Sequence, residues 1–240
     1  MASVVEDREW RWSAARHGAA GLLALIAVTG TVEAGALGQA VAVYLLFAAA
    51  MAAVAPGHAA APSFGGANRI TLVRLVMVCG LAGYIGRPEA AAVVWPLLGI
   101  AVMALLLDGV DGWWARRTGA VSDFGARFDM EVDALAILVL SALIWQLDKA
   151  GAWVVLSGAL RYAFVVAGWL WSWLRRPLPQ SERRRVVCAA QVAALVACLA
   201  PILPSAVTPW IAAAGLALTA WSFAVDFVWL YRQRMTVSLP

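Results

Sequence analysis

The chain has 240 residues, of which 63% are apolar and only 13% are charged, and its mean hydropathy is +0.81. A soluble domain is typically about a quarter charged and about half apolar, so this composition excludes an ordinary soluble globular protein. The net charge of +4 comes from arginines in short segments between apolar runs, which favours membrane orientation over a nucleic-acid partner.

Eight apolar stretches predict eight transmembrane helices, because about 20 helical residues are needed to cross the hydrocarbon core of a bilayer. Gly, Pro and charged residues separate these stretches. In chain order they cover residues 18–34, 36–55, 70–86, 90–107, 124–146, 151–174, 186–203 and 208–231. The predicted fold class is therefore an all-α polytopic integral membrane protein, with a six-helix core preceded by two extra transmembrane helices.

A Gly- and Pro-rich segment at residues 62–66 predicts the domain boundary. Asn68 follows it and is interpreted as the N-cap of the next helix, because Asn is a preferred capping residue. We expect an N-terminal helical pair over residues 1–64 and a six-helix domain over residues 65–240.

The distribution of arginines predicts the orientation in the membrane. If the N-terminus is cytoplasmic and the spans alternate, thirteen arginines lie in cytoplasmic segments, whereas the opposite side has only Arg87 and Lys149, each beside an acid. Positive residues are enriched on the cytoplasmic side of membrane proteins. We therefore expect both termini in the cytoplasm, and the membrane to be a bacterial cytoplasmic (inner) membrane.

Six of the 14 acidic residues lie between Asp108 and Asp133. A charged residue at a helix centre in the bilayer costs about 2.5–3.5 kcal/mol, so this cluster needs compensation. Asp108 and Asp111 are three residues apart, and Asp129 and Asp133 are four apart, so each pair shares a helix face. Four carboxylates balance two divalent ions. Oxygen ligands without a nearby His or Cys favour Mg²⁺ or Mn²⁺, with the site at the cytoplasmic surface.

Paired hard cations are typical of phosphoryl transfer, in which they neutralise phosphate oxygens and stabilise the leaving group. Gly112 and Gly125 are interpreted as positions where a ligand or a neighbouring backbone comes close. Arg116 can donate a charge-assisted hydrogen bond to phosphate. The motif therefore predicts a metal-dependent reaction at a phosphate.

The motif also carries a family resemblance. The chain reads Asp108-Gly-Val-Asp111-Gly112-Trp-Trp-Ala115-Arg116, then eight residues, then Gly125-Ala-Arg-Phe-Asp129-Met-Glu-Val-Asp133. The pattern D-x2-D-G-x2-A-R-x8-G-x3-D-x3-D resembles the signature of the CDP-alcohol phosphotransferases, also called CDP-alcohol phosphatidyltransferases. Every specified position is met, and the resemblance covers about residues 65–231.

This resemblance implies transfer of a phosphatidyl group from CDP-diacylglycerol to a small polar alcohol, with release of CMP, by a protein that forms a homodimer. By position, it implies that Asp133 is the general base. The implied metal ligands are Asp108, Asp111, Asp129 and Asp133. The implied CDP-lipid contacts are Asn68, Thr71, Gly112, Arg116, Ser122 and Gly125.

The acceptor alcohol is predicted from two arginines. Arg161 lies in an apolar run, where it requires an anionic partner. The following region resembles in part the phosphatidylglycerophosphate synthases, in which an Arg occurs in the corresponding span and a G-K-x-K-T-x2-Q run follows. Arg185 and Gln191 keep their places in that run, whereas Val187 replaces a Lys. We expect glycerol 3-phosphate as acceptor, bound by Arg161 and Arg185; an inositol phosphate, serine and an amino alcohol stay open.

Other classes of membrane protein make different predictions. A cation transporter or metal-binding membrane protein would have acids spread through several helices at depth, whereas here they concentrate on two adjacent helices at one surface. A catalytically inactive scaffold would not need four intact aspartates. Asp226 and Glu33 are interpreted as unpaired acids near spans.

Overall fold

The computed structural model of the protein describes residues 2–29, 34–54, 65–118, 122–176, 178–179 and 181–237. Within these ranges the side chains of residues 2–12, 28–29, 34, 53–54, 111, 113–116, 118 and 235–237 are outside the description. The predicted site residues Asp111 and Arg116 are among them.

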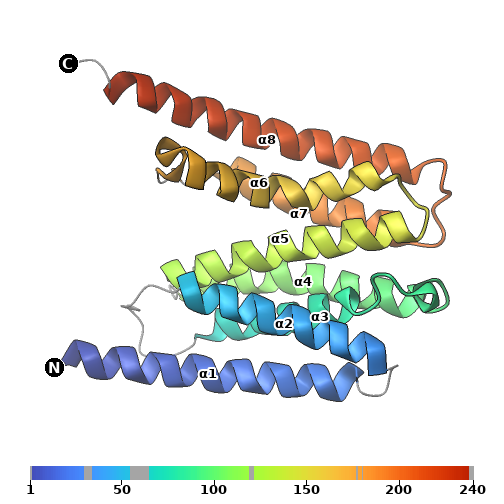
Figure 1. Ribbon diagram of the computed structural model, residues 1–240, viewed down its shortest axis with the longest axis horizontal. Helices are drawn as coiled ribbons and strands as arrows, with labels where there is room; N and C mark the ends of the chain where they lie inside the picture. Colours follow the sequence, from blue (N-terminus) through green and yellow to red (C-terminus); the bar gives the residue numbers. More distant parts are fainter. Residues whose placement is uncertain are drawn as a thin grey trace. The chain divides into compact units, whose positions relative to one another are not determined.

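The described residues form eight α-helices and no strand, which confirms the all-α fold class (Figure 1). The helices are α1 (Ala2–Thr29), α2 (Ala34–Val54), α3 (Gly66–Ala82), α4 (Val94–Thr118), α5 (Asp123–Gln146), α6 (Leu156–Leu170), α7 (Glu182–Leu199) and α8 (Thr208–Val237). Most begin and end within a few residues of the predicted spans. The clear exceptions are α1, which begins in the charged leader, and α4, which continues through the acidic motif.

Three of the described helical segments are long and apolar enough to cross a membrane: Gly35–Ala52, Ala152–Leu170 and Thr208–Arg234. A shorter apolar helix covers Val94–Val110. These segments agree with an all-α membrane protein. That each of the eight helices crosses the bilayer stays a prediction.

The chain divides into two compact units, residues 1–135 (unit 1) and residues 136–240 (unit 2). Helix α5 contributes its first half to unit 1 and its second half to unit 2. The predicted domain boundary falls after residue 64, and residues 55–64 are outside the described part of the chain. The division into a helical pair and a six-helix domain therefore stays a prediction.

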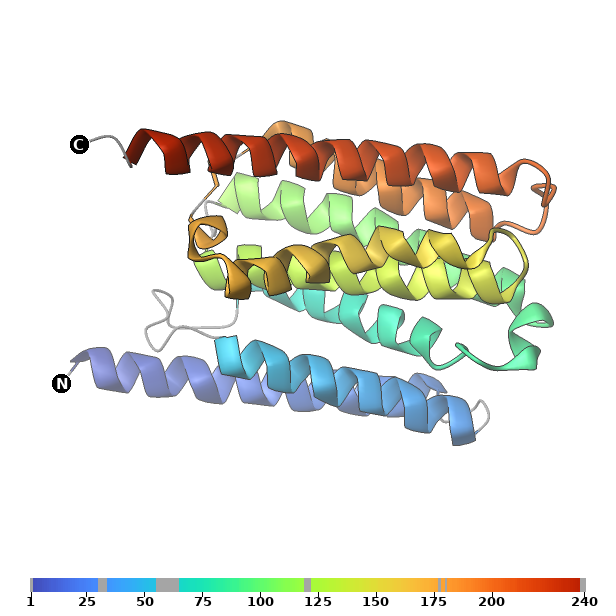
Figure 2. The same cartoon turned by 45° about the horizontal axis from the view of Figure 1, so that its top comes forward.

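In unit 1 the leading helices α1 and α2 run alongside α3 (Figures 1 and 2). The side-chain amide of Gln39 on α2 donates to the carbonyls of Ala82 and Ile85, at 3.1 Å each. The hydroxyl of Tyr44 donates to the Gly18 carbonyl of α1 at 2.7 Å. The Ala82 carbonyl also accepts the Ile85 N–H at 3.1 Å, so Gln39 adds a second donor there and joins α2 to the turn that follows α3.

The start of α3 corrects one prediction. The N-cap is Gly65, with extended backbone at φ −60° and ψ 166°, and its carbonyl accepts the Arg69 N–H at 3.2 Å. Asn68 is therefore not the N-cap but lies inside the first turn of the helix, where its side chain is buried. The capping preference of Asn misled the prediction, because Gly also caps helices well without a side chain.

In unit 2 the helices α5 and α6 meet at Gly158 of α6. A Cβ at this position would lie 2.5 Å from the Cα of Leu138. Small residues let two transmembrane helices approach this closely. At the end of the unit where α8 begins, the Thr208 hydroxyl donates to the Lys149 carbonyl at 2.5 Å, and the Lys149 ammonium donates to the Leu203 carbonyl at 2.8 Å.

Candidate active site

One face of α3 carries Asn68, Thr71 and Arg74, spaced three residues apart. All three side chains are buried, and Arg74 is only 4% exposed. A guanidinium is always charged, so its burial requires anionic partners. The Thr71 hydroxyl donates to the Ala67 carbonyl at 3.1 Å.

The partners of Arg74 are three motif aspartates. Its Nη2 lies 2.8 Å from Oδ1 of Asp108 on α4, and its Nη1 lies 2.6 Å from Oδ1 of Asp129 on α5. Nη2 also pairs with Oδ1 of Asp133, one turn beyond Asp129. Each carboxylate is partly exposed. The three side chains therefore meet around one guanidinium.

The aspartate cluster, defined as Asp108, Asp129 and Asp133, has the geometry of a candidate cation site. One carboxylate oxygen from each residue lies within 4.8 Å of the others. Carboxylate oxygens are the ligands preferred by Mg²⁺ and Mn²⁺, so the donor set fits such ions. The fourth predicted ligand, Asp111, has no described side chain. Metal binding at this cluster stays a prediction.

Arg74 is the site residue that sequence reasoning missed. It was interpreted as part of a span, although a charge within an apolar run signals a buried anionic partner. The spacing to Asn68 and Thr71 also indicated a common face. Its partners lie 34–59 residues away in the sequence, so no local sequence pattern identifies them.

Ser122 and Gly125 form the start of α5. The Gly125 N–H donates to the Ser122 hydroxyl at 3.0 Å, which is the bond of a helix N-cap and explains why the helix begins at residue 123. A Cβ on Gly125 would lie 2.6 Å from Oδ1 of Asn68 and 3.0 Å from the Ser122 hydroxyl. Three of the residues predicted to contact CDP therefore lie together. Their ligand role stays a prediction, as does that of Gly112 on α4.

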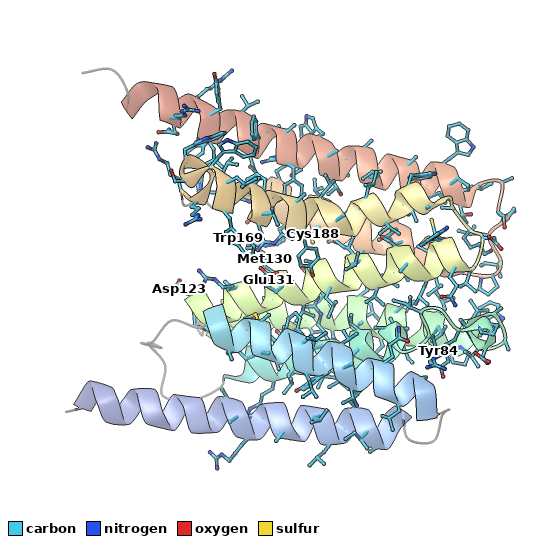
Figure 3. All side chains as sticks on the ribbon, viewed as in Figure 1. Tyr84, Asp123, Met130, Glu131, Trp169 and Cys188 are labelled. Atoms are coloured by element: carbon cyan, nitrogen blue, oxygen red, sulfur yellow. The ribbon has the colours of Figure 1, made fainter. Side chains whose placement is uncertain are left out.

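Asn68, Ser122 and Gly125 belong to the end of unit 1 at which α3 and α5 begin, and Asp129 and Asp133 follow along α5. Asp123 marks the first turn of α5, and Tyr84 marks the opposite end of the unit, just beyond α3 (Figure 3). Because Asn68 on α3 lies beside the start of α5, the beginnings of these two helices bring three predicted CDP contacts together.

A separate cavity lies in unit 2. Its volume is about 460 Å³, and Arg161 is one of two arginines in its wall. Arg175 also donates from Nε to the Gly168 carbonyl at 2.6 Å, near the Trp169 end of α6 (Figure 3). The lining residues are Arg161, Phe164, Val165, Gly168, Trp169, Leu174 and Arg175. A cationic wall with aromatic neighbours suits a small anion.

Arg185, the second predicted acceptor residue, is exposed on α7. Its Nη1 donates to both carboxylate oxygens of Glu182 at 3.0 Å, and it is not among the residues that line the cavity. Its neighbour in the resemblance, Gln191, is 1% exposed and contacts α8 through Thr219, whose hydroxyl lies 3.4 Å from Oε1. A role of Arg185 in acceptor binding stays a prediction.

Asp226 on α8 was wrongly interpreted as an unpaired acid. It forms an ion pair with Nη2 of Arg183, and Nη1 of Arg184 lies 3.4 Å from its Oδ1. Nη1 of Arg183 also donates to the carbonyl and the hydroxyl of Ser222, at 2.6 Å each. The error arose because the partners are 43 and 42 residues away on another helix.

Comparison with known proteins places this site in a family context. Residues 64–221 match the family described as CDP-alcohol phosphatidyltransferase. A 94-residue segment is 32% identical to the CDP-diacylglycerol–glycerol-3-phosphate 3-phosphatidyltransferase of Bacillus subtilis (strain 168). The aligned segment covers 37% of this chain and 49% of that protein, so the chain spans about half the length of this curated relative. No solved structure matches the chain.

Proposed function

The chain belongs to the CDP-alcohol phosphatidyltransferase family, and from that premise we propose that it transfers a phosphatidyl group from CDP-diacylglycerol to glycerol 3-phosphate, releasing CMP. The observation that carries this proposal is the convergence of Asp108, Asp129 and Asp133 from two helices. All three lie within the family-matched segment. The name of the Bacillus subtilis relative supports the choice of acceptor.

Two divalent ions, Mg²⁺ or Mn²⁺, complete the proposed site. Asp108, Asp111 and Asp129 would ligate them, with Asp133 completing the second position. Bound ions of this kind neutralise phosphate oxygens and stabilise the departing phosphate. The grouping of carboxylate oxygens within 4.8 Å supports this assignment.

The proposed reaction is one displacement at phosphorus. The hydroxyl oxygen of the acceptor forms a bond to the phosphorus that bears diacylglycerol, and the bond from that phosphorus to the oxygen of CMP breaks. Asp133 accepts the proton of the hydroxyl, and CMP leaves with the bonding electron pair. A carboxylate serves as general base when it lies within hydrogen-bond reach of the hydroxyl whose proton it accepts. Atoms and charge balance without an oxidant or reductant.

The CDP moiety would lie against the beginnings of α3 and α5. This place has the polar side chains of Asn68, Thr71 and Ser122, and Gly125 lets Asn68 and Ser122 come close to the start of α5. Gly112 and Arg116 would contribute from α4. The close contact of Gly125 with Asn68 supports a shared role for these residues.

The phosphate of the acceptor would bind near Arg161. The cavity lined by Arg161 and Arg175 supports an acceptor that carries an anionic group. This favours glycerol 3-phosphate or an inositol phosphate over serine or an amino alcohol. Arg185 is proposed to attract the anion at the surface.

In the membrane, we propose that both termini and the site face the cytoplasm, where water-soluble acceptors are dissolved, and that the protein is a homodimer in a bacterial inner membrane. A cation transporter is the rival function. The grouping of the described cluster acids at one place, instead of along a path, favours the enzyme.

The test is CMP release by the purified full-length chain from labelled CDP-diacylglycerol, with Mg²⁺ and each candidate acceptor in turn. We expect turnover with glycerol 3-phosphate. Asp133→Asn should lower turnover at least about a hundredfold, the lower end of the usual contribution of a general base, and Asp108→Asn should raise the Mg²⁺ concentration required. Glu89→Gln, at an exposed position in the turn before α4, is the matched control and should keep wild-type turnover. Metal flux into proteoliposomes without CMP release would overturn the proposal.

A further inference from the structure

The guanidinium of Arg74 occupies the centre of the aspartate cluster. Its two terminal nitrogens contact Asp108 at 2.8 Å, Asp129 at 2.6 Å, and Asp133. Arg74 is 4% exposed, so the guanidinium is shielded from water, whereas the three carboxylates are partly exposed. Charge-assisted hydrogen bonds of this kind are short and strong, and they hold the three carboxylates together against their mutual repulsion.

The same carboxylates are the proposed ligands of two divalent ions, and this creates a conflict of charge. The four motif aspartates carry four negative charges, which two divalent ions balance in full. The guanidinium is then one positive charge in excess, and it repels the ions strongly in weakly polar surroundings. It also engages oxygen lone pairs that an ion would need at about 2.0–2.1 Å.

We propose that Arg74 is a resident counter-cation that competes with divalent ions for the aspartate cluster. In the ion-free protein it keeps the carboxylates together, and it withdraws from them when ions bind. This inference rests on the proposed function, since it assumes that the cluster holds divalent ions. Arg74 is thus a positioning residue, which acts through the aspartates.

The competition has a consequence for substrate binding. A guanidinium displaced from carboxylates needs another anion, and its planar fork suits a pyrophosphate. A CDP-linked lipid supplies one. Binding of the liponucleotide therefore favours binding of the ions, and the reverse. The site binds ions weakly without the liponucleotide and tightly when the liponucleotide is bound.

The experiment measures Mn²⁺ affinity of the full-length protein in detergent, from the electron paramagnetic resonance signal of free Mn²⁺, without lipid substrate. Arg74→Gln removes the competing charge, so the Mn²⁺ dissociation constant should fall about tenfold, within the usual range of coupling between two sites. Arg74→Lys keeps the charge and should stay within roughly threefold of wild type. If Arg74 only held the aspartates in place, Arg74→Gln would bind Mn²⁺ more weakly than the wild type. That result would overturn the inference.

The matched control is Arg87→Gln. Arg87 lies at the other end of α3, where its Nε donates to the Gly83 carbonyl at 2.9 Å. Loss of this arginine should leave the Mn²⁺ affinity unchanged. A second titration with CDP-diacylglycerol present should tighten Mn²⁺ binding in the wild-type protein and tighten it less in Arg74→Gln.

If Arg74→Gln does not fold, the wild-type protein provides the test. Infrared difference spectra of chain labelled with ¹³C-guanidino arginine, recorded with and without Mn²⁺, should contain a shifted guanidinium band that Arg74→Lys lacks. Mn²⁺ binding without such a shift would overturn the inference.

Failure of the inference and failure of the proposed function give different results. A wild-type protein that binds Mn²⁺ and releases CMP, with no tighter binding in Arg74→Gln, overturns the role of Arg74 alone. A wild-type protein that binds no divalent ion even with CDP-diacylglycerol present overturns both.

Discussion

At Gly125 the start of α5 lies close to Asn68 of α3. There is no space for a methyl group here, because a Cβ would lie 2.6 Å from Oδ1 of Asn68 and 3.0 Å from the hydroxyl of Ser122. That hydroxyl caps α5. A side chain at this position would therefore disturb both the cap and a predicted CDP contact.

We predict that Gly125→Ala lowers the free energy of unfolding by about 1–3 kcal/mol, the usual cost of overpacking, and raises the KM for CDP-diacylglycerol more than it lowers kcat. Gly99→Ala on α4 is the control, because no atom lies within 4 Å of its added Cβ. Thermal unfolding and CMP release in the same detergent measure both effects. Equal stability and equal KM in the two variants would contradict this account of Gly125.

The grouping of Asp108, Asp129 and Asp133 could be predicted from the sequence. Asp129 and Asp133 are one helical turn apart, and Asp108 lies on the preceding helix, so helical spacing and chain adjacency suffice to bring them together. Arg74 has no such local relation to them, since its contacts depend on how α3 packs beside α4 and α5. Asn68 was recognised as a polar residue of interest, but its place inside the helix depended on the cap at Gly65.

At the scale of elements, α7 and α8 are joined by a polar contact in a largely apolar surrounding. The guanidinium of Arg183 pairs with Asp226 and donates to Ser222, and it also lies 5.7 Å from the ring centroid of Trp221. The Asp226 side chain is 10% exposed. Arg183, with Arg184 at 3.4 Å from the same carboxylate, thus joins α7 to α8, whereas Arg185 of the triplet does not contact Asp226.

We predict that Asp226→Asn lowers the free energy of unfolding by about 1.5–3 kcal/mol, the usual worth of a hydrogen bond to a charged group. The bonds from Arg183 to Ser222 remain, so the loss should stay below that of a fully unpaired buried charge. Thermal unfolding at neutral pH measures it. Glu182→Gln breaks the exposed pair with Arg185 and should change the free energy by less than about 0.5 kcal/mol. Similar losses of unfolding free energy in Asp226→Asn and Glu182→Gln would contradict the expected difference between a buried and an exposed ion pair.

The helices themselves could be predicted because long apolar runs are unambiguous, whereas the roles of adjacent arginines could not. Successive residues on a helix point about 100° apart, so Arg183 contacts α8 while Arg185 is exposed with Glu182. The sequence triplet contains no signal that selects between them until the partner helix is known.

At the scale of the whole molecule, the arginine distribution predicts orientation in the bilayer. We predict that the turn after α5 lies outside the cytoplasm and that the start of α7 lies inside. In a chain whose three native cysteines are replaced by Ala, Asp148→Cys should react with an impermeant maleimide in intact spheroplasts. Glu182→Cys should react only after permeabilisation. Both positions are exposed in the structure, so the reverse labelling pattern would contradict the predicted topology.

The side-chain amide of Gln39 matters for any attempt to produce the family-matched segment without the two leading helices. Without α2, the Ile85 carbonyl would lose its Gln39 donor, whereas the Ala82 carbonyl would keep the Ile85 N–H, at the end of α3 remote from Asn68. Through this contact, α2 holds the turn that follows the helix carrying Arg74. A protein that contains the family-matched segment without α2 would therefore need another hydrogen-bond donor for the Ile85 carbonyl.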